Sequence, residues 1–326
     1  MTAPFAGRRV LDLSAQALQR PHALAIAMAC RLAASFGAEV VRPAAEGDKL
    51  AGMPPLLPDG SSAVERFLLV GRVPEATGRF DAAIGDTDSL REVDAPLGIR
   101  ISVFGSGDDP PMSELGLMAL SGVLAAVQPE QGTPARLGGH QVAYAAGLSA
   151  FTALAGGLRA GRPESVDVSI FDVACWLNWK AAASALLLGS PAASGQQRSD
   201  WHTLPAADGH VALVYMVKDW PALRDMVGDE RLSDPRFATQ RGRLENQKAL
   251  DAVLGPWFAI RSRAEITRLA QARRIPIGPV LSPSELLQDK QHRARAFIGA
   301  GGMPRLPLLW DGAAPEWRAE GAYHAA

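Results

Sequence analysis

The chain has 326 residues, with 33 Lys and Arg against 34 Asp and Glu, so its formal net charge is −1. This balance leaves no broad basic surface, and nucleic acid is not expected as a partner. Apolar residues make up 48% of the chain and charged residues 21%, which excludes a wholly disordered protein. At about 150 residues per domain, the length predicts two domains.

The cysteines and the apolar segments bear on metals and on membranes. Cys30 and Cys175 lie far apart without CxxC or Cys/His spacing, so neither a disulfide framework nor a metal site is expected. The uncharged run 143–158 has sixteen residues. A membrane span needs about 20, so this run predicts a buried helix and no membrane partner. Arg8 and Arg9 interrupt the apolar start, and we expect a cytoplasmic protein.

The first half of the chain predicts a parallel sheet covered by helices. A strand at 9–13, an Ala-rich helix at 23–36 that Gly37 ends, and a strand at 38–41 form a βαβ unit. Further strands are expected at 66–70, 81–84, 98–104 and 165–170. Apolar helices are expected at 114–127, 142–158 and 171–188.

The second half predicts a smaller α+β domain. The Gly-, Ser- and Pro-rich stretch 189–200 indicates a domain boundary, and the aperiodic tail from Gly301 predicts an extended strap. Between them we expect a strand at 209–216 and helices at 220–227, 243–260, 264–273 and 283–288, with an interruption at 275–280. The predicted division is a large Rossmann-like α/β domain at 1–198, completed by 295–326, and a small α+β domain at 199–294.

Asp172 is the candidate catalytic residue. It lies in VDVSIFDVACWLN, where a strand passes into a helix among apolar neighbours, and burying a carboxylate there is costly unless something uses it. Ser169 and Asp172 also have the i, i+3 spacing of a capping box, so a purely structural role stays open. The alternative is a nucleophile, correctly placed at the carboxyl end of a strand.

The other polar motifs are weaker. Gly105-Ser106-Gly107 follows a strand, as phosphate-binding loops do, but lacks the GxGxxG pattern. Residues 241–245 predict a solvated helix face. Four arginines flank predicted strand or helix edges, where they would meet a diphosphate or only solvent: Arg20, Arg42, Arg72 and Arg136. Four histidines show no metal-ligand spacing and are expected at the surface or in hydrogen bonds: His22, His140, His202 and His292.

Several segments, in matching order, resemble the class III CoA-transferases, the family of formyl-CoA transferase, carnitine CoA-transferase and α-methylacyl-CoA racemase. RRVLDLS with Pro21, then FGAEVVRPAAEGD, is similar to the family's opening strand and its GAEV–basic–GD signature. ISVFGSGDDPP, MALSG and VDVSIFDVACWLN resemble three further stretches, the last of which holds the family's nucleophilic aspartate. Similar segments in the second half are 208–212, 234–239, 243–246 and 275–280.

The resemblance implies a CoA-transferase that moves CoA between small carboxylic acids, with acyl-CoA as substrate and no metal. Asp172 would attack the thioester, giving an acyl–aspartyl anhydride and then an enzyme–CoA thioester. It also implies an interlocked dimer, either a homodimer or a heteromer with a related subunit. The CoA contacts implied are Pro21, Arg42, Arg72, Gly105 and Arg136, with Gly195 and Gln196 in an oxyanion loop.

Departures from the family pattern keep two alternatives in view. Residues 82–97 lack the Asn-Phe-Arg-Pro-Gly motif that helps to hold CoA, which leaves open a catalytically diminished subunit or binding protein. The racemase branch uses a paired histidine and aspartate, whose positions align with Ser113 and Ala143. An acyl-CoA racemase or epimerase is therefore disfavoured.

Overall fold

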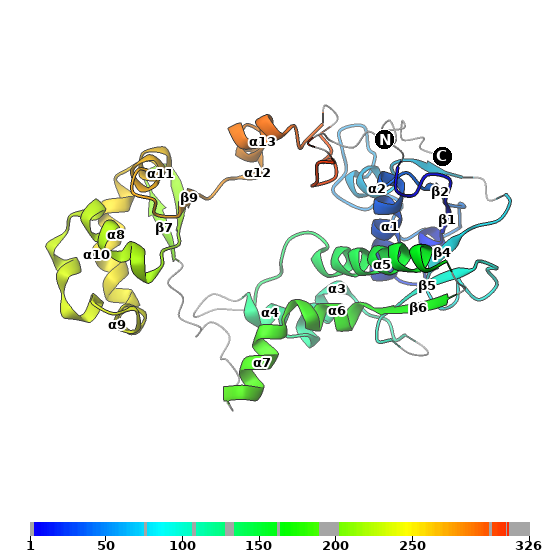
Figure 1. Cartoon of the computed structure of the whole chain (residues 1–326), viewed down its shortest axis with the longest axis horizontal. Helices are drawn as coiled ribbons and strands as arrows, with labels where there is room; N and C mark the ends of the chain where they lie inside the picture. The colour runs from blue at the N-terminus through cyan, green and yellow to red at the C-terminus, as the bar shows by residue number, and fades with distance from the viewer. Residues whose placement is uncertain are drawn as a thin grey trace. The chain divides into compact units, whose positions relative to one another are not determined.

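The computed structural model of the chain (Figure 1) forms two compact units, residues 1–195 with 303–326 and residues 196–302. Each unit has its own hydrophobic core. The residues described are 3–74, 77–105, 109–127, 134–161, 164–188, 202–299, 302–310 and 312.

The larger unit is built on a six-stranded parallel sheet with the order β3-β2-β1-β4-β5-β6. The chain adds β2 and β3 on one side of β1, and then adds β4, β5 and β6 on the opposite side. Ligands of open α/β sheets bind at the carboxyl ends of the strands near such a reversal. The strands are β1 (Arg9–Asp12), β2 (Glu39–Val41), β3 (Arg72–Val73), β4 (Ala82–Gly85), β5 (Leu97–Ser102) and β6 (Glu164–Ser169). The predicted Rossmann-like parallel sheet is confirmed.

Two long helices, α1 (Arg20–Ser35) and α5 (Gln141–Ala160), pack against each other and against one face of the sheet (Figure 1). A Cβ added at Gly147 would lie 2.6 Å from Met28 Cβ and 2.7 Å from Ala25 O, so only glycine permits this approach. Among the described residues, α5 alone has the length and composition of a membrane span. Core helices of folded domains meet the same criteria. The helix predicted for 142–158 is confirmed as α5, but only 39% of its most apolar window is buried, so one face packs on the core and the rest is partly or fully exposed.

Three predicted elements of the larger unit differ from the structure. The strand expected at 66–70 is wrong, because Ser62 accepts a hydrogen bond from the N–H of Glu65 and starts α2 (Ala63–Leu68). The helix expected at 114–127 is broken by Gly122, at φ +76°, into α3 (Glu114–Leu120) and α4 (Val123–Ala126). The helix expected at 171–188 is broken at Asn178 into α6 (Ile170–Leu177) and α7 (Trp179–Leu188).

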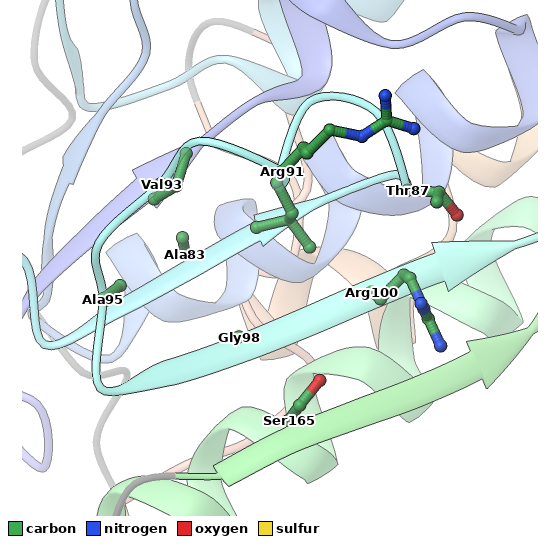
Figure 2. A pocket seen from close by; sticks show the side chains of 9 residues that line it. Ala83, Thr87, Arg91, Val93, Ala95, Gly98, Arg100 and Ser165 are labelled. Carbon is green, nitrogen blue, oxygen red and sulfur yellow. The ribbon is translucent and has the colours of Figure 1, made fainter.

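The described residues cover the other face of the sheet only in part. Residues 86–96, all of them described, join β4 to β5 without a helix. Beside them lies a hollow of about 340 Å³ over β4, β5 and β6 (Figure 2). The sheet is polar here, since Arg100 on β5 pairs with Asp167 on β6 through two contacts of 2.5 and 2.6 Å. Parallel sheets are normally buried on both faces, so this one is unusual.

The smaller unit has a three-stranded antiparallel sheet with the order β7-β8-β9, packed with short helices. The predicted α+β fold of this part is confirmed, although neither β7 nor β9 was predicted. The strands are β7 (His202–Ala206), β8 (Gly209–Leu213) and β9 (Ile277–Pro279). The helices are α8 (Trp220–Val227), α9 (Gln240–Glu245), α10 (Gln247–Ala259), α11 (Arg263–Gln271), α12 (Pro283–Leu286) and α13 (Lys290–Arg295).

The solvated face predicted for 241–245 is correct for only one side of α9. Arg241 and Glu245 form an exposed ion pair at 2.7 Å. Arg243 lies on the opposite side and is buried, with its guanidinium 4.6 Å from the Trp220 ring and 5.6 Å from the Tyr215 ring. Residues i and i+4 share a helix face while i+2 lies on another, so the same helix carries the exposed ion pair and the buried arginine.

Candidate active site

The candidate site lies where β5 and β6 end. Ser102 and Ser169, the last residues of these two strands, are paired in register. β6 passes directly into α6, and β5 passes into a turn at 103–105. The carboxyl ends of two neighbouring parallel strands therefore bring this turn and the start of α6 together.

Asp172 is the third residue of α6, and its side chain is exposed. Its N–H donates to Ser169 Oγ at 3.1 Å, which is one half of a capping box. The other half would be a bond from the Ser169 N–H back to the Asp172 carboxylate, and no such bond forms among the described residues. The serine thus caps the helix, while the carboxylate accepts no hydrogen bond from the described part of the chain and lies at a helix N-terminus, which favours negative charge.

The turn after β5 is fastened to the start of α6. Val103 O accepts hydrogen bonds from the Phe171 N–H at 3.0 Å and from Ser169 Oγ at 3.2 Å. The rings of Phe104 and Phe171 lie 5.3 Å apart. Gly105 follows at φ +87°, and its N–H donates to Ser102 Oγ at 2.9 Å. The predicted site residue Gly105 therefore lies in the turn that is bonded to the segment carrying Asp172.

Gly105→Ala is expected to lower the free energy of unfolding by about 1–2 kcal/mol, because a side chain at positive φ is strained. The added Cβ would lie 3.6 Å from Ser169 Cβ, an ordinary contact, so backbone strain is the cause. Urea denaturation measures the effect. Gly98→Ala on β5 is the control, since its Cβ meets nothing within 4 Å. Equal losses of unfolding free energy in Gly105→Ala and Gly98→Ala would contradict backbone strain at Gly105 as the cause.

Arg72, predicted to contact CoA, is instead committed to the fold. Its Nε lies 2.8 Å from Asp12 Oδ2, and the two side chains are 7% and 0% exposed. Its remaining N–H groups donate to backbone carbonyl oxygens, those of Ala27, Cys30, Leu68 and Val70. All five donors are taken, so the guanidinium has none left for a phosphate.

Arg42 lies beside this pair. Its Nε donates to Ser14 Oγ at 2.8 Å and its Nη2 to Asp48 at 2.6 Å. Burial pushes the pKa of Asp12 upward, but the guanidinium groups of Arg72 and Arg42 and the hydrogen bonds from Ser14 outweigh it, so the pKa is lowered. Burial, followed by the negative charge of Asp12, raises the pKa of the Cys30 thiol well above its usual value.

The lowered pKa of Asp12 predicts a pH dependence of stability. Its folded pKa lies below the unfolded value of about 3.9, so the stabilisation is complete above that value and is lost as the pH falls through the folded pKa. In urea denaturation at successive pH values below about 5, Asp12→Asn should flatten the acid limb of the stability curve. An unchanged acid limb would contradict the role given to this pair.

The other predicted site residues lie elsewhere or outside the described chain. Pro21 is buried in the first turn of α1, and Arg136 is exposed in the segment that precedes α5. Gly195 and Gln196 lie outside the described residues. Among the residues described, no hydrogen bond joins Pro21, Arg42 or Arg136 to Asp172, and no group of His, Cys, Asp and Glu is arranged to hold a metal ion.

Two buried carboxylates near the site were not predicted. Glu114 accepts from the N–H groups of Val142 and Ala143 at 2.9 and 3.3 Å and lies 2.9 Å from His140 Nδ1, so it caps α5 from another helix. Asp109 is paired with His22. Each partner is more than twenty residues away along the chain, and no sequence spacing signals such pairs.

The positions aligned with the racemase pair have structural roles. Ser113 is the N-cap of α3 and accepts from the Gly116 N–H at 3.1 Å. Ala143 is fully buried in α5. Neither side chain titrates near neutral pH, so neither can exchange a proton as an acid–base pair does.

The fold and the free carboxylate at the head of α6 define an open α/β protein with a candidate nucleophile at the carboxyl end of its sheet. The chain belongs to CoA-transferase family III, whose model matches residues 95–317. It is 27% identical over 244 residues to the acetyl-CoA:oxalate CoA-transferase of Acetobacter aceti, covering 67% of this chain and 61% of that protein. It is 26% identical over 245 residues to the succinyl-CoA:glutarate CoA-transferase of Mus musculus, covering 67% and 53%.

A solved structure of a CAIB/BAIF family protein from Brucella suis has the same fold. The TM-score is 0.80 at 21% identity, over 96% of this chain and 94% of that one. The two curated relatives are longer proteins, and the matched region spans less than two thirds of each.

Proposed function

We propose that the protein transfers CoA between small carboxylic acids, with Asp172 as the nucleophile. The observation that carries this proposal is the exposed carboxylate of Asp172, which accepts no hydrogen bond among the described residues although its own helix cap is in place. Family membership supports the reaction class. The names of the relatives support acids of the size of oxalate or glutarate.

The reaction proceeds through acyl derivatives of Asp172. A carboxylate oxygen attacks the thioester carbonyl of the donor acyl-CoA, a C–O bond forms, and the C–S bond breaks to release CoA thiolate. The thiolate attacks the aspartyl carbonyl of the anhydride and expels the donor acid. The acceptor carboxylate then attacks the enzyme–CoA thioester, and the released thiolate takes the acceptor acyl group, which restores Asp172. Each acyl derivative is reactive enough to be an intermediate.

The ligand contacts follow from the donors that the fold leaves available. Arg42 keeps its Nη1 without a hydrogen bond among the described residues, and Arg136 is exposed. These two arginines, with Pro21 and Gly105, are our proposed CoA contacts. For Arg72 we propose a structural role in place of the predicted CoA contact. Gly195 and Gln196 stay proposed as the oxyanion loop, which would stabilise charge on the attacked carbonyl.

Trapping the acylated protein tests this function. The protein is incubated with acetyl-, succinyl- or oxalyl-CoA, quenched with hydroxylamine or borohydride, digested, and analysed by mass spectrometry. Modification of the peptide that holds Asp172, absent from Asp172→Asn, is the expected result. Absence of an adduct with every donor, together with no heat of CoA binding in calorimetry, would contradict it.

A second candidate function is a catalytically diminished CoA-transferase-like subunit. The absence of the Asn-Phe-Arg-Pro-Gly motif from 82–97 and the fully engaged donors of Arg72 favour it, because both remove groups that would hold CoA. Calorimetry distinguishes the two candidates. CoA binding with acylation of Asp172 supports the transferase, and binding without acylation supports the subunit.

We propose that a second copy of this chain, or a related subunit, covers an apolar patch on α6 and α7. Trp176 is 72% exposed and lies one helical turn after Asp172. An interlocked dimer, as the family resemblance implies, would exclude water from this patch and shield the anhydride from hydrolysis. Sedimentation equilibrium measures the association, and a monomer at micromolar concentration would contradict it. The other exposed residues of the patch are Leu177, Trp179, Leu186 and Leu187.

A further inference from the structure

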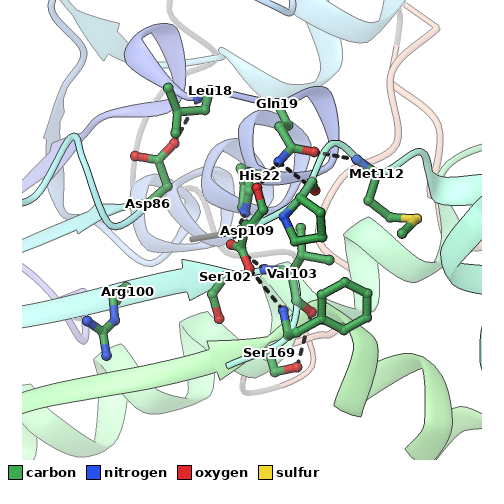
Figure 3. A network of polar contacts seen from close by, with 12 residues as sticks. Leu18, Gln19, His22, Asp86, Arg100, Ser102, Val103, Asp109, Met112 and Ser169 are labelled. Carbon is green, nitrogen blue, oxygen red and sulfur yellow. Dashed lines mark hydrogen bonds and ion pairs between the residues drawn. The ribbon is translucent and has the colours of Figure 1, made fainter. Parts of the chain in front are cut away.

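His22 and Asp109 form a buried pair between the first turn of α1 and the loop after β5 (Figure 3). His22 Nε2 lies 3.1 Å from Asp109 Oδ2, and the two side chains are 1% and 8% exposed. Nδ1 of His22 has no hydrogen-bond partner in the part of the chain that the structure describes. A hydrogen on Nδ1 would be left unbonded, so the geometry assigns it to Nε2, which donates to Asp109.

The Asp109 carboxylate also holds the backbone of the turn after β5. Its Oδ2 accepts from the Val103 N–H at 2.6 Å, and its Oδ1 accepts from the Phe104 N–H at 3.2 Å. Gln19 ties the same loop to α1, because its side chain accepts from the Met112 N–H at 2.7 Å. Both oxygens of the buried carboxylate are therefore bonded, as burial of a charge requires.

The turn at 103–105, which Asp109 holds, is also hydrogen-bonded to the start of α6. Val103 O accepts from both the Phe171 N–H and Ser169 Oγ, and Ser169 Oγ accepts from the Asp172 N–H. A continuous series of hydrogen bonds thus leads from the buried pair to the residue proposed as nucleophile. A shift of the turn would move the first residues of α6 with it.

We propose that Asp109 is a positioning residue for CoA transfer and that His22 holds it in place. This inference rests on the proposed function of Asp172. Neither residue of the pair touches the reacting atoms. They set where the backbone of 103–105 lies, and through it where α6 begins and the Asp172 carboxylate stands. A misplacement of about 1 Å can lower a rate about 100-fold, so the pair acts on turnover more than on binding.

Asp109→Asn is expected to lower kcat for CoA transfer about 10- to 100-fold and to change KM for acyl-CoA by less than about twofold. In either orientation the amide offers one oxygen where the carboxylate has two, so one backbone N–H loses its acceptor. Asp86→Asn is the matched control. Asp86 is 2% exposed, follows β4, and accepts from the N–H groups of Leu18 and Ser89 at 2.8 and 2.9 Å. It should lose similar stability and keep its kcat.

His22 provides a rescue series. His22→Gln places an N–H donor near the position of Nε2 and should retain the wild-type kcat. His22→Leu has a similar size but no donor, and its kcat should fall in the same direction as that of Asp109→Asn. Equal kcat values for Gln and Leu at position 22 would overturn the role given to the pair.

Hydrogen exchange at the amides of 169–172 separates this inference from the role of Asp172, because it needs no turnover. Asp109→Asn should speed exchange there, and Asp86→Asn should not. If the wild type transfers no CoA while exchange responds as expected, the proposed function fails and the positioning of α6 stands. If the wild type is active and Asp109→Asn changes neither kcat nor exchange, the positioning role is overturned. Should Asp109→Asn fail to fold, the Gln and Leu variants of His22 decide by the same two measurements.

Discussion

Asp172→Asn is expected to lower CoA transfer at least about 1,000-fold while the protein stays folded, because a neutral amide is a poor nucleophile. The backbone N–H that donates to Ser169 is kept in this variant. The loss of a negative charge at the head of α6 should lower the free energy of unfolding by only about 0.3–1 kcal/mol. Initial rates with paired acyl-CoA and acid substrates, and urea denaturation, measure the two effects.

Ser262→Ala is the matched control for this variant. Ser262 caps α11 in the smaller unit by accepting from the Glu265 N–H at 3.2 Å. Removing that cap should lower the free energy of unfolding by about 1 kcal/mol and leave transfer intact. If Asp172→Asn behaved like Ser262→Ala, losing stability but no activity, Asp172 would be a cap residue only.

Arg72→Met is expected to lower the free energy of unfolding by about 3–5 kcal/mol, since it leaves the fully buried carboxylate of Asp12 without its nearest cation. The same substitution also removes the arginine donor of Leu68 O at the end of α2, and a second donor of Ala27 O, which keeps its helical hydrogen bond. Urea denaturation measures the loss. The double variant with Asp12→Asn and Arg72→Met should lose less free energy of unfolding than the two single variants lose in sum, because the two residues interact directly.

Arg91→Met is the control for Arg72. Arg91 pairs with Asp88 at 2.9 Å on the surface, where an ion pair contributes at most about 1 kcal/mol. A loss for Arg72→Met as small as that for Arg91→Met, combined with weaker CoA binding in calorimetry, would favour the CoA contact first predicted for Arg72.

The sheet could be predicted from the sequence because its signals are local. The strands at 9–13, 38–41 and 165–170 are short apolar runs beside turn residues, and the structure confirms them within one or two residues. The run at 66–70 has the same apolar character but forms the end of α2 and the turn after it. There the cap formed by Ser62, four residues earlier, outweighs the strand propensity of the run.

The candidate site could be predicted only in part. Asp172 and Gly105 belong to sequence patterns, and their positions at the ends of β6 and β5 follow from strand direction. The pair of His22 and Asp109 joins residues 87 positions apart, and the fold alone brings them together. The pair of Arg72 and Asp12 could not be predicted for the same reason. In a sequence, a buried arginine is indistinguishable from a solvated one until its partner is known.

The side of the sheet that the described residues leave open offers a place for a label. A thiol introduced by Ser165→Cys would stand exposed over β6, beside a glycine whose Cβ position is empty. Both natural cysteines are expected to react with a maleimide more slowly than the introduced thiol. Burial raises the pKa of Cys30, and burial with the charge of Asp172 raises that of Cys175, so little thiolate forms on either near neutral pH. A single fluorophore can therefore be attached to the larger unit away from the carboxyl ends of the strands, where it would not obstruct the proposed ligand site.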